Sequence, residues 1–478
     1  MHMQCERCRY STARYRIQAE SSAGKTVLSL CEYCAAEMGI GPWNSQMPVR
    51  SSEILDSLLD ADEGMICHGC GLTYSQVRAA GRLGCEHCLD SFADELAASL
   101  LSSQKRLEHS LVAMPYHSGD LPDKLRQMSV LLGIAVAAED EIPAVSHAEN
   151  ENINLSWEWH ESAGSADDVV ACSRVVCSRS VADLPLGHYL SQEEARKIAI
   201  NCGLQASNFS RQDRLILREK LYIDQRDDSP ALAVWGKRAS IVIGGQEQLR
   251  TISVASGLSL ETCLEASVAE MKDLEQSVQV RARVDFGYVN SSIGLLGDGV
   301  QLVVVLHLWA LDILGGIDAV RQGCRKDGLF FRRLPGGFFQ LISNGSLGVP
   351  LADRHNLLES QVVALVHYER QARIDVLQQR VDEWIAKLGV RFYDLCQAEA
   401  HSWQSLADFM SDLRVAAALG CLPGINTAML GSLAISLQPA HLRAEKEIGS
   451  LQGETVEHWR AQLFRQRLSD SFEQRKEK

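Results

Sequence analysis

The residues best suited to chemistry in this sequence are cysteines near the N-terminus that occur in pairs. Each pair has the CxxC spacing, with which a tight turn places both sulfurs on one metal ion. The eight paired cysteines are Cys5 and Cys8, Cys31 and Cys34, Cys67 and Cys70, and Cys85 and Cys88. Two pairs complete a tetrahedron of thiolates, which is a ligand set of structural zinc. The sequence therefore predicts two Zn²⁺ sites.

The second set of cysteines has fourteen residues between its pairs, close to the spacing of a zinc ribbon, and the first set has twenty-two. Four thiolates leave no open position for water, so we expect structural rather than catalytic zinc. The alternative is a set of reduced structural thiols. His68 and His87 lie inside the second set and are expected to be bystanders. Such small modules bury little core, so zinc should supply most of their folding energy, on the order of 10 kcal/mol or more per site. We expect them to serve interaction or regulation.

The composition of the chain indicates a protein of several packed domains. It has 478 residues, of which 46% are hydrophobic, and a net charge of −14. This negative charge excludes an overall basic field that would attract nucleic acid. A local basic patch stays an open alternative. The first residues of the chain lack the charged start and following apolar run of a signal peptide, so we expect none. The most apolar run, "VQLVVVLHLWALDIL", is interrupted by His307 and Asp312 and is short for a membrane span. We expect a cytoplasmic protein without a membrane partner, this run being a buried strand that leads into a helix.

From about residue 165 the sequence has the pattern of a large α+β domain. "DVVACSRVVCSR" predicts a strand, and "ALAVWGKRASIVIGGQEQLRTISVASG" predicts three short ones. "SQEEARKIAINCG" and "SLETCLEASVAEMKDLEQSV" have helical spacing, each with a serine cap ahead of acidic residues. Strands and helices mix without regular alternation, which favours the α+β class. One long helical pattern covers residues 357–389, and the last eighty or so residues are predicted to be mainly helical.

Several of these segments resemble a known family both in their residues and in their order along the chain. "CSRVVCSRSVADLPLGHYLSQEEA", "FGYVNSSIGLLGDGVQLVVVLHL" and "FQLISNGSLG" are similar to bacterial protein-arginine kinases of the McsB type, relatives of the phosphagen kinases. "SLQPAHLRAE" is similar to a segment of the protein-arginine kinases in particular. The CxxC frame with "AGRLGCEHCLDSF" resembles their zinc-binding activator of the McsA type, which is usually a separate chain. The chain thus resembles an activator fused to an ATP:guanido phosphotransferase-like protein.

With this resemblance, the predicted division of the chain has five parts. They are a zinc module at 1–40, a second zinc module at 60–110, a linker with a degenerate helical hairpin at 111–164, a phosphagen-kinase-like domain with a mixed or antiparallel sheet at 165–390, and a helical region at 391–478.

The catalytic turn of the family is altered in this sequence. Arginine's guanidinium is protonated at any cellular pH, so its phosphorylation requires carboxylates that orient it and accept a proton. "GGQEQLR" aligns with the family's Asn-Glu-Glu-Asp-His-Leu-Arg. The resemblance places the catalytic glutamate on Gln246 and the neighbouring aspartate on Glu247, and the reactive cysteine falls on Ser292. One acidic group therefore survives beside a position that has lost its base.

The nucleotide positions implied by the resemblance are also partly replaced. The phosphates of ATP require several arginines and magnesium to offset their charge. Arg174 and Arg250 match phosphate-binding arginines, whereas two more arginine positions fall on Val176 and Gln301 and a nucleotide-contacting histidine falls on Leu221. These replacements put binding of ATP and Mg²⁺ in doubt. The two arginines could instead be surface salt-bridge partners, and the shortened loop "FRRLPGGF" offers Arg332 or Arg333 as a substitute.

Three functions remain open at this point. The first is a catalytically impaired, kinase-like scaffold or regulator linked to arginine phosphorylation and Clp-type protein quality control. The second is an active ATP:guanidino phosphotransferase that uses shifted groups such as Glu247 and Arg333. The third is a reader that binds phosphoarginine without making it. Gln246 favours the first or third, and the first is our prediction. The partners that the resemblance implies are an arginine kinase or a Clp-type protease or regulator, and a homo-oligomer stays open.

Overall fold

The structure is a computed structural model that divides into two units, Met1–Phe92 and Ala93–Lys478, which we describe separately. It describes residues 15–21, 24–30, 65–96, 158–204, 211–223, 232–245, 247–344, 349–378, 381–420, 422, 425–445 and 456–473. The first cysteine set, Cys5, Cys8, Cys31 and Cys34, lies outside these residues, as does most of the predicted linker.

The first unit contains a hairpin and a small helical module. The antiparallel strands are β1 (Tyr15–Ser21) and β2 (Gly24–Leu30). The short helices are α3 (Tyr74–Ala80) and α4 (His87–Ser91). Thr73 caps α3 through a reciprocal pair of hydrogen bonds with Gln76. The second cysteine set lies on this helical module.

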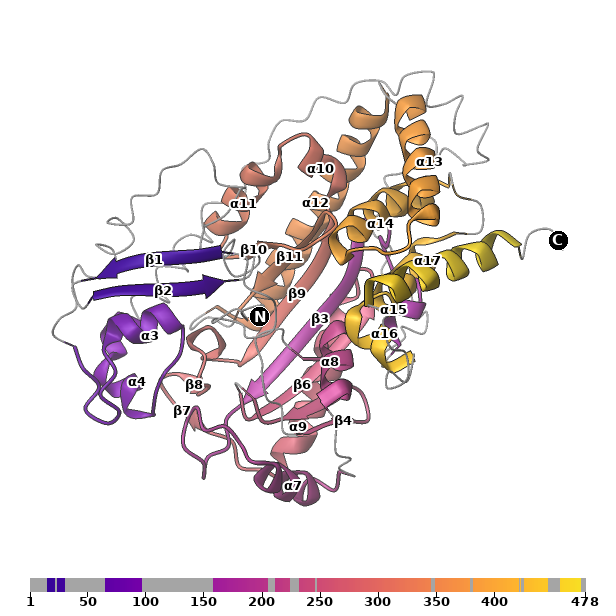
Figure 1. Cartoon of the computed structure of the whole chain (residues 1–478). Coiled ribbons are helices and arrows are strands. Elements are labelled where there is room, and N and C mark those ends of the chain that lie inside the picture. Colours follow the sequence, from indigo (N-terminus) through magenta and orange to yellow (C-terminus); the bar gives the residue numbers. More distant parts are fainter. Residues whose placement is uncertain are drawn as a thin grey trace. The chain divides into compact units, whose positions relative to one another are not determined.

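The second unit is built on one seven-stranded sheet in which every strand pair is antiparallel (Figure 1). The central strand β3 is flanked by β9 on one side and β6 on the other. β9 is rich in valine, whose branched side chain favours strands. From edge to edge the strands are β10 (Phe330–Arg333), β11 (Phe338–Ser343), β9 (Val300–His307), β3 (Val170–Arg179), β6 (Leu249–Ser256), β5 (Ser240–Ile243) and β4 (Leu232–Trp235). The predicted strands and the α+β class are confirmed.

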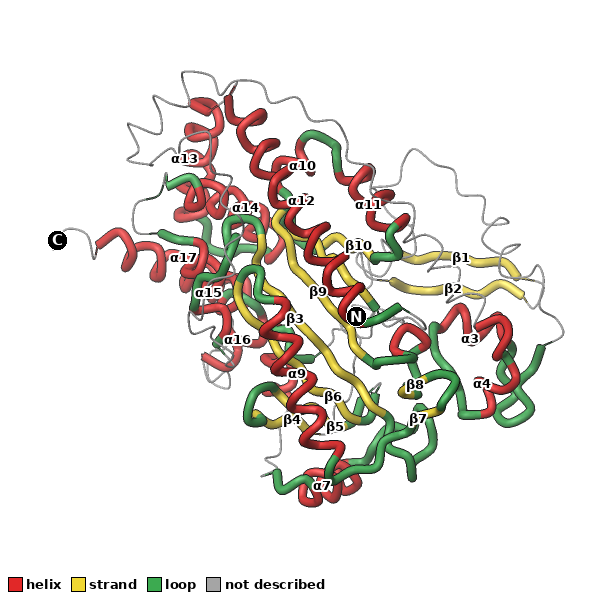
Figure 2. The backbone as a smooth tube through the Cα atoms, turned by 180° about the vertical axis from the view of Figure 1, so that it is seen from behind, coloured by secondary structure: helices red, strands yellow, loops and turns green. Residues whose placement is uncertain are grey.

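Helices α9 (Leu260–Glu275) and α12 (Leu351–Gln378) cover one face of the sheet (Figure 2). Alternate strand residues such as Val175 and Val304 pack with Val362 of α12 in a single buried core. The other elements of this domain are α7 (Gln192–Asn201), α10 (Trp309–Ile313), α11 (Ile317–Lys326), η3 (Ile293–Leu295), β7 (Ala282–Arg283) and β8 (Gly287–Tyr288).

The opposite face of the sheet is covered by other elements. Trp159 and Tyr222 pack there against Val176 and Val254 of the sheet. Trp159 belongs to η2 (Trp159–Glu161), and Tyr222 follows α8 (Arg211–Glu219). Because both faces are covered, β3 is buried at every position except one.

The C-terminal region is helical, as predicted, and has a core of its own that includes Leu406, Phe409 and Phe464. None of the described helices is long and apolar enough to span a membrane. The helices of this region are α13 (Val381–Gln397), α14 (Trp403–Ala418), α15 (Thr427–Ser436), α16 (Pro439–Glu445) and α17 (Val456–Glu473).

Two details of the helices differ from the sequence prediction. The single helical pattern at 357–389 belongs to two helices, α12 and α13. The predicted serine cap is present on α7, where Ser191 accepts from the backbone of Glu194. Ser259 does not cap α9, because its hydroxyl donates to the carbonyl of Ser256 instead.

The scattered cysteines mostly lie in the core, as expected for small hydrophobic residues. Cys421 is outside the described residues. Cys172, Cys177, Cys263 and Cys324 are buried, and Cys202 and Cys396 are half-buried.

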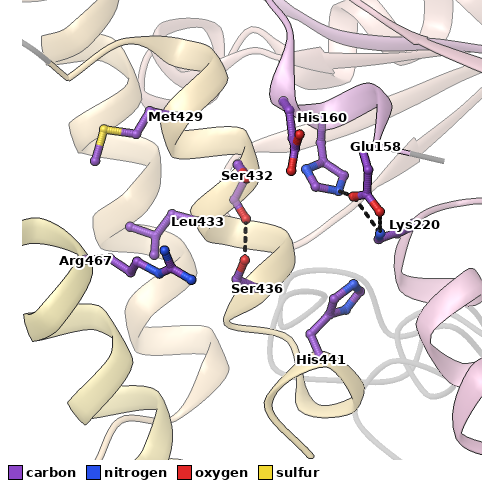
Figure 3. A pocket seen from close by; sticks show the side chains of 10 residues that line it. Glu158, His160, Lys220, Met429, Ser432, Leu433, Ser436, His441 and Arg467 are labelled. Carbon is purple, nitrogen blue, oxygen red and sulfur yellow. Dashed lines mark hydrogen bonds and ion pairs between the residues drawn. The ribbon is translucent and has the colours of Figure 1, made fainter. Parts of the chain in front are cut away.

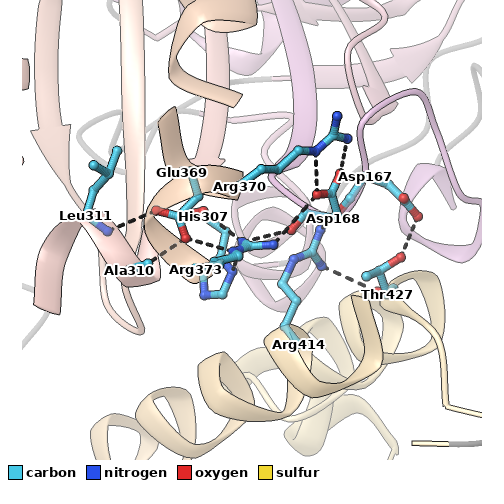
Figure 4. A network of polar contacts seen from close by, with 10 residues as sticks. All are labelled: Asp167, Asp168, His307, Ala310, Leu311, Glu369, Arg370, Arg373, Arg414 and Thr427. Carbon is cyan, nitrogen blue, oxygen red and sulfur yellow. Dashed lines mark hydrogen bonds and ion pairs between the residues drawn. The ribbon is translucent and has the colours of Figure 1, made fainter. Parts of the chain in front are cut away.

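A buried polar network joins the sheet to the C-terminal helices (Figure 4). Glu369 of α12 is fully buried and accepts from Arg373 Nε at 2.8 Å and from the backbone of Ala310 at 3.0 Å. Arg373 lies against His307 of β9, whose Nε2 is 2.7 Å from Ser411 Oγ of α14. His307 is thus a buried, hydrogen-bonded histidine that links three elements.

Candidate functional site

The four cysteines of the second set come together in the small helical module. The first pair lies on a knuckle closed by a hydrogen bond from Cys67 N to Leu72 O at 2.8 Å. The second pair lies at the start of α4, where Cys88 is fully buried. The sulfurs are 3.6 Å apart for Cys67 and Cys85 and 3.5 Å apart for Cys70 and Cys88, and all four lie within 4.8 Å of one another. A tetrahedral zinc–thiolate site has sulfurs about 3.8 Å apart, so the cluster fits zinc.

Residues around the cluster support this geometry. A Cβ at Gly84 would lie 2.9 Å from Cys70 Sγ and 2.5 Å from Leu72 Cδ1, so only glycine fits beside the sulfur. The imidazole of His68 is hydrogen-bonded to Ser91 Oγ at 3.0 Å. This contact agrees with the expectation that His68 is a bystander.

The thiols differ in their affinity for protons. Burial raises the pKa of Cys85 to about 11 and that of Cys88 to about 12. Burial also opposes ionisation of Cys67, but hydrogen bonds from the backbone of Cys70 and Gly69 lower its pKa to about 6. Binding of a metal by four thiolates must therefore release protons, as expected for a structural zinc site.

The positions aligned with phosphate-binding arginines share one face of the sheet. Directly paired residues of neighbouring strands point to the same side, and so do alternate residues of one strand. Val176 of β3 pairs with Gln301 of β9, and Ser178 pairs with Arg250 of β6. Arg174 is two residues before Val176. The structure therefore brings Arg174, Val176, Arg250 and Gln301 to one face, which we call the arginine face.

The register also separates the two substitute arginines. Arg332 pairs with Gln340, which pairs with Val305, which in turn pairs with Cys172 of β3. This series places Arg332 on the arginine face. Arg333 points to the other side, where it forms an ion pair with Asp312.

The two retained arginines are buried rather than on the surface. Arg174 is 5% exposed and Arg250 is 3% exposed, so the alternative of surface salt bridges is wrong. Arg250 Nη2 donates to Gly244 O at 3.1 Å. Gly244 and Gly245 have φ of 88° and 98°, which favours glycine in this turn. The side chain of Arg250 thus holds the turn that carries the altered catalytic motif.

The positions where the resemblance implies a further arginine and a nucleotide-contacting histidine carry Gln301 and Leu221. Gln301 Nε2 donates to Asn344 Oδ1 at 2.7 Å. Leu221 has a φ of 66° and packs against the core of the arginine face. Neither side chain supplies a positive charge to this face.

The surviving acid of the motif is held by the loop that carries the reactive-cysteine position. Glu247 is 3% exposed. Its carboxylate accepts hydrogen bonds from Ser291 N at 3.0 Å, Ser291 Oγ at 2.9 Å and Ser292 N at 2.8 Å. Hydrogen bonds to the charged form of a carboxylate favour that form and reduce its tendency to take a proton. Gln246 lies outside the described residues.

Side chains that the sequence analysis did not assign hold the far end of this loop. Arg179 donates to Glu275 Oε1 at 2.6 Å and to Asp298 O at 3.0 Å, and its guanidinium lies 3.4 Å from the ring centre of Tyr288. Arg354 Nη2 donates to Asp298 Oδ2 at 2.6 Å. The glycine-rich segment "GLLGDG" is therefore a turn tied to the body of the domain. Arg354, in the first turn of a helix, carried no sequence pattern that would reveal this contact.

Comparison with known proteins finds matches to three family models along the chain. Residues 65–110 match the McsA central zinc-finger domain. Residues 193–372 match the ATP:guanido phosphotransferase C-terminal catalytic domain, and residues 395–478 match the protein-arginine kinase McsB C-terminal domain. The match at 65–110 contains the four-cysteine cluster.

Curated relatives cover most of the second unit. The protein-arginine kinase of Symbiobacterium thermophilum is 26% identical over 342 residues, which are 65% of this chain and 96% of that protein. The protein-arginine kinase of Geobacillus stearothermophilus is 27% identical over 344 residues, 65% of this chain and 93% of that protein.

Solved structures give weaker matches. The duplicated taurocyamine kinase of Schistosoma mansoni with bound transition state analog components has a TM-score of 0.42 at 15% identity, covering 61% of this chain and 40% of that one. A lombricine kinase has a TM-score of 0.39 at 13% identity, covering 60% of this chain and 80% of that one.

Residues 193–372 of the second unit thus resemble the catalytic domain of the ATP:guanido phosphotransferase class. More particularly, the chain resembles a fusion of an McsA-type zinc finger with a protein-arginine kinase-like protein of the McsB type. The zinc-finger match and the cysteine cluster together support zinc binding.

Proposed function

We propose that this protein is a zinc-binding, kinase-like scaffold or regulator whose phosphotransferase site is impaired. The observation that carries the proposal is the position of Glu247. Both oxygens of its carboxylate accept hydrogen bonds from Ser291 or Ser292. The acid that survives in the catalytic motif is therefore engaged in holding a loop, and the aligned catalytic position is Gln246, whose amide cannot act as a base.

The charges of the arginine face support the same proposal. Transfer of a phosphoryl group depends mainly on positioning and on positive groups that stabilise its negative charge. Arg174, Arg250 and Arg332 share this face, but Val176 and Gln301 stand where the resemblance implies two more arginines. The arginine face thus keeps three arginines that can bind an anion and lacks the two further arginines that the resemblance implies.

The link to protein quality control comes from the resemblance. McsA-type proteins are activators of McsB-type kinases, and here the two are joined in one chain. We infer that the zinc module and the kinase-like unit bind protein partners, either a protein-arginine kinase or a Clp-type protease or its regulator. Arginine phosphorylation would be regulated through these contacts.

A second candidate function is recognition of phosphoarginine without its synthesis. The three arginines on one sheet face favour it, since guanidinium groups bind phosphate with paired hydrogen bonds. An active transferase is the third candidate, and it requires Glu247 to leave its contacts with Ser291 and Ser292.

Two measurements on the whole chain separate these functions. The first is phosphoryl transfer from labelled MgATP to an arginine-rich unfolded protein, scored as acid-labile phosphoarginine. The second is binding of phosphoarginine peptides, compared with unmodified peptides, for the wild type and Arg250→Ala. The scaffold proposal predicts neither transfer nor specific binding. Specific binding that Arg250→Ala abolishes would establish the phosphoarginine reader. Robust phosphoryl transfer would refute both the scaffold and the reader.

A further inference from the structure

A cavity lies between the start of the α+β domain and the C-terminal helices (Figure 3). Its volume is about 440 Å³. It is lined from η2, the end of α8, and helices α15, α16 and α17. The side chains in its wall that can bind a metal are Glu158, His160, Glu161 and His441.

His160 is the most deeply buried of these groups. It is 6% exposed, and its Nδ1 makes no hydrogen bond to the part of the chain that the structure describes. Its Nε2 lies 3.0 Å from Glu158 Oε2, at the distance of an ion pair (Figure 3). A buried polar atom without a hydrogen bond costs free energy.

His160 is also part of a compact group of donor atoms. One atom each from Glu158, His160 and Glu161 lies within 4.8 Å of the other two. Nitrogen and oxygen ligands of one zinc-like ion, each about 2.1 Å from it, are about 3.0 to 3.4 Å apart. The separation of 3.0 Å between His160 Nε2 and Glu158 Oε2 matches this range.

A second histidine, His441, lies in the wall of the same cavity but outside this compact group. Its Nδ1 is 2.7 Å from Glu219 Oε2, and the same carboxylate accepts hydrogen bonds from the backbone of Ala440 at 2.7 Å and of His441 at 3.1 Å. Its Nε2 is buried and has no hydrogen-bond partner among the described residues.

A cation already lies beside the carboxylate of Glu158. Lys220 Nζ donates to its two oxygens at 2.6 and 2.7 Å. This ammonium shows that the carboxylate is a favourable place for positive charge, and it competes with any other cation there. Lysine has a flexible stem, so it can withdraw when a divalent ion binds more strongly.

We propose that Glu158, His160 and Glu161 form a binding site for a divalent transition-metal cation, with His441 in the wall of the same cavity. Imidazole and carboxylate donors suit Zn²⁺ and Co²⁺. The bound ion fastens η2, which precedes the central strand β3. This site is independent of the proposed function and of the four-cysteine cluster.

The test uses the full chain with its cysteine sites loaded with Zn²⁺, titrated with Co²⁺ by calorimetry and visible absorption. We expect one further equivalent of Co²⁺ with weak absorption bands, because thiolate ligands would add strong charge-transfer bands. His160→Ala and Glu161→Gln should each weaken binding at least about 10-fold. Lys220→Met should tighten it by removing the competing cation.

His188→Ala is the matched control, because His188 also lies beside a glutamate, Glu194, at 3.1 Å. It should leave Co²⁺ binding unchanged. Glu161 is exposed, so its variant is expected to fold even if His160→Ala does not. Absence of the further equivalent, or binding that Glu161→Gln leaves unchanged, would overturn the proposal. Weaker binding in Lys220→Met would also overturn it, since the lysine would then be supporting the ion rather than competing with it.

Discussion

The backbone N–H of Ser292 donates to the carboxylate of Glu247 at 2.8 Å, joining two positions that are 45 residues apart in the chain. By the resemblance, Ser292 stands where arginine-phosphorylating enzymes have a reactive cysteine, and Glu247 stands where they have an acidic residue of the motif. In this protein their contact is a buried clamp, to which Ser291 adds two further hydrogen bonds. Glu247 thus holds the loop of Ser291 and Ser292 in place.

The first prediction concerns the stability that this clamp provides. Glu247→Gln keeps the shape of the side chain but loses the charge and one acceptor, so buried donors are left without a good partner. We expect a cost of about 1–3 kcal/mol in the free energy of unfolding. Ser291→Ala, which removes only the hydroxyl, should cost less. Denaturant unfolding of the whole chain measures both.

The control for this prediction is Glu193→Gln, an exposed glutamate paired with Lys197, which should leave the unfolding transition unchanged. A Glu247→Gln protein as stable as the wild type would contradict the structural role of the clamp.

The second prediction concerns the buried network around Glu369. Its oxygens accept from Arg373, Ala310 and Leu311, and burial raises the pKa of this carboxyl. Glu369→Gln leaves the guanidinium of Arg373 with only the more distant carboxylate of Asp168, at 3.7 Å, and we expect a loss of about 3 kcal/mol in the free energy of unfolding. The exposed pair Glu383 and Lys387 is the matched control, since Glu383→Gln should have little effect. Equal effects of the two variants would show that the network adds no stability.

The third prediction is a pH dependence that comes from His307. Burial, with the positive charges of Arg373 and Arg414 nearby, holds the pKa of His307 well below its usual value. The unfolded chain takes up the proton near pH 6.5 whereas the folded chain does not, so this contribution to stability is present above pH 6.5 and is lost as the pH falls. The carboxyls of Glu369, Asp408 and Asp412, whose pKa values burial raises, act in the opposite direction.

A difference measurement isolates the histidine from these carboxyls. Unfolding of the wild type and of His307→Asn is compared between pH 7 and pH 5. The stability of the wild type should fall relative to the variant by up to about 1.4 kcal/mol per pH unit below about pH 6. Parallel pH profiles would mean that His307 does not resist protonation.

The fourth prediction concerns zinc. The two four-cysteine sites of the wild type should together hold two equivalents of zinc, and Cys85→Ser and Cys5→Ser should each contain one equivalent less than the wild type, as measured by elemental analysis. Cys396→Ser, a change at a half-buried thiol outside the CxxC pairs, should keep both. Loss of the metal at the second site should remove on the order of 10 kcal/mol of folding energy from this module, seen as lost hydrogen-exchange protection at residues 65–96. One equivalent in the wild type would contradict the site at Cys5, Cys8, Cys31 and Cys34.

Features that depend on local spacing could be predicted from the sequence. The CxxC pairs of the second set lie together because each pair is set by one short turn. The strands β3 and β9 and the helix α7 follow from residue pattern and from the cap at Ser191. The common face of Arg174 and Arg250 was implied by resemblance and is now given by the strand register.

Features that depend on contacts across the fold could not be predicted. The choice between Arg332 and Arg333 follows from the pairing of β10 with β11, which no local pattern specifies. The engagement of Glu247 depends on a loop 44 residues away. A glutamate followed by a turn has the same sequence pattern whether its carboxylate is free to take a proton or is held by buried amides.

The central claim is that the phosphotransferase site lacks the groups for turnover. The most direct measurement is transfer of labelled phosphate from MgATP to an arginine-rich unfolded protein by the zinc-loaded wild type. A triple variant that combines Gln246→Glu, Val176→Arg and Gln301→Arg is measured beside it. We predict no acid-labile phosphoarginine above background for the wild type. The triple variant should form labelled phosphoarginine if the three restored side chains are the ones that the site lacks. Clear turnover by the wild type that Glu247→Gln abolishes, while Ser291→Ala retains it, would contradict the account, because Glu247 would then act in the reaction.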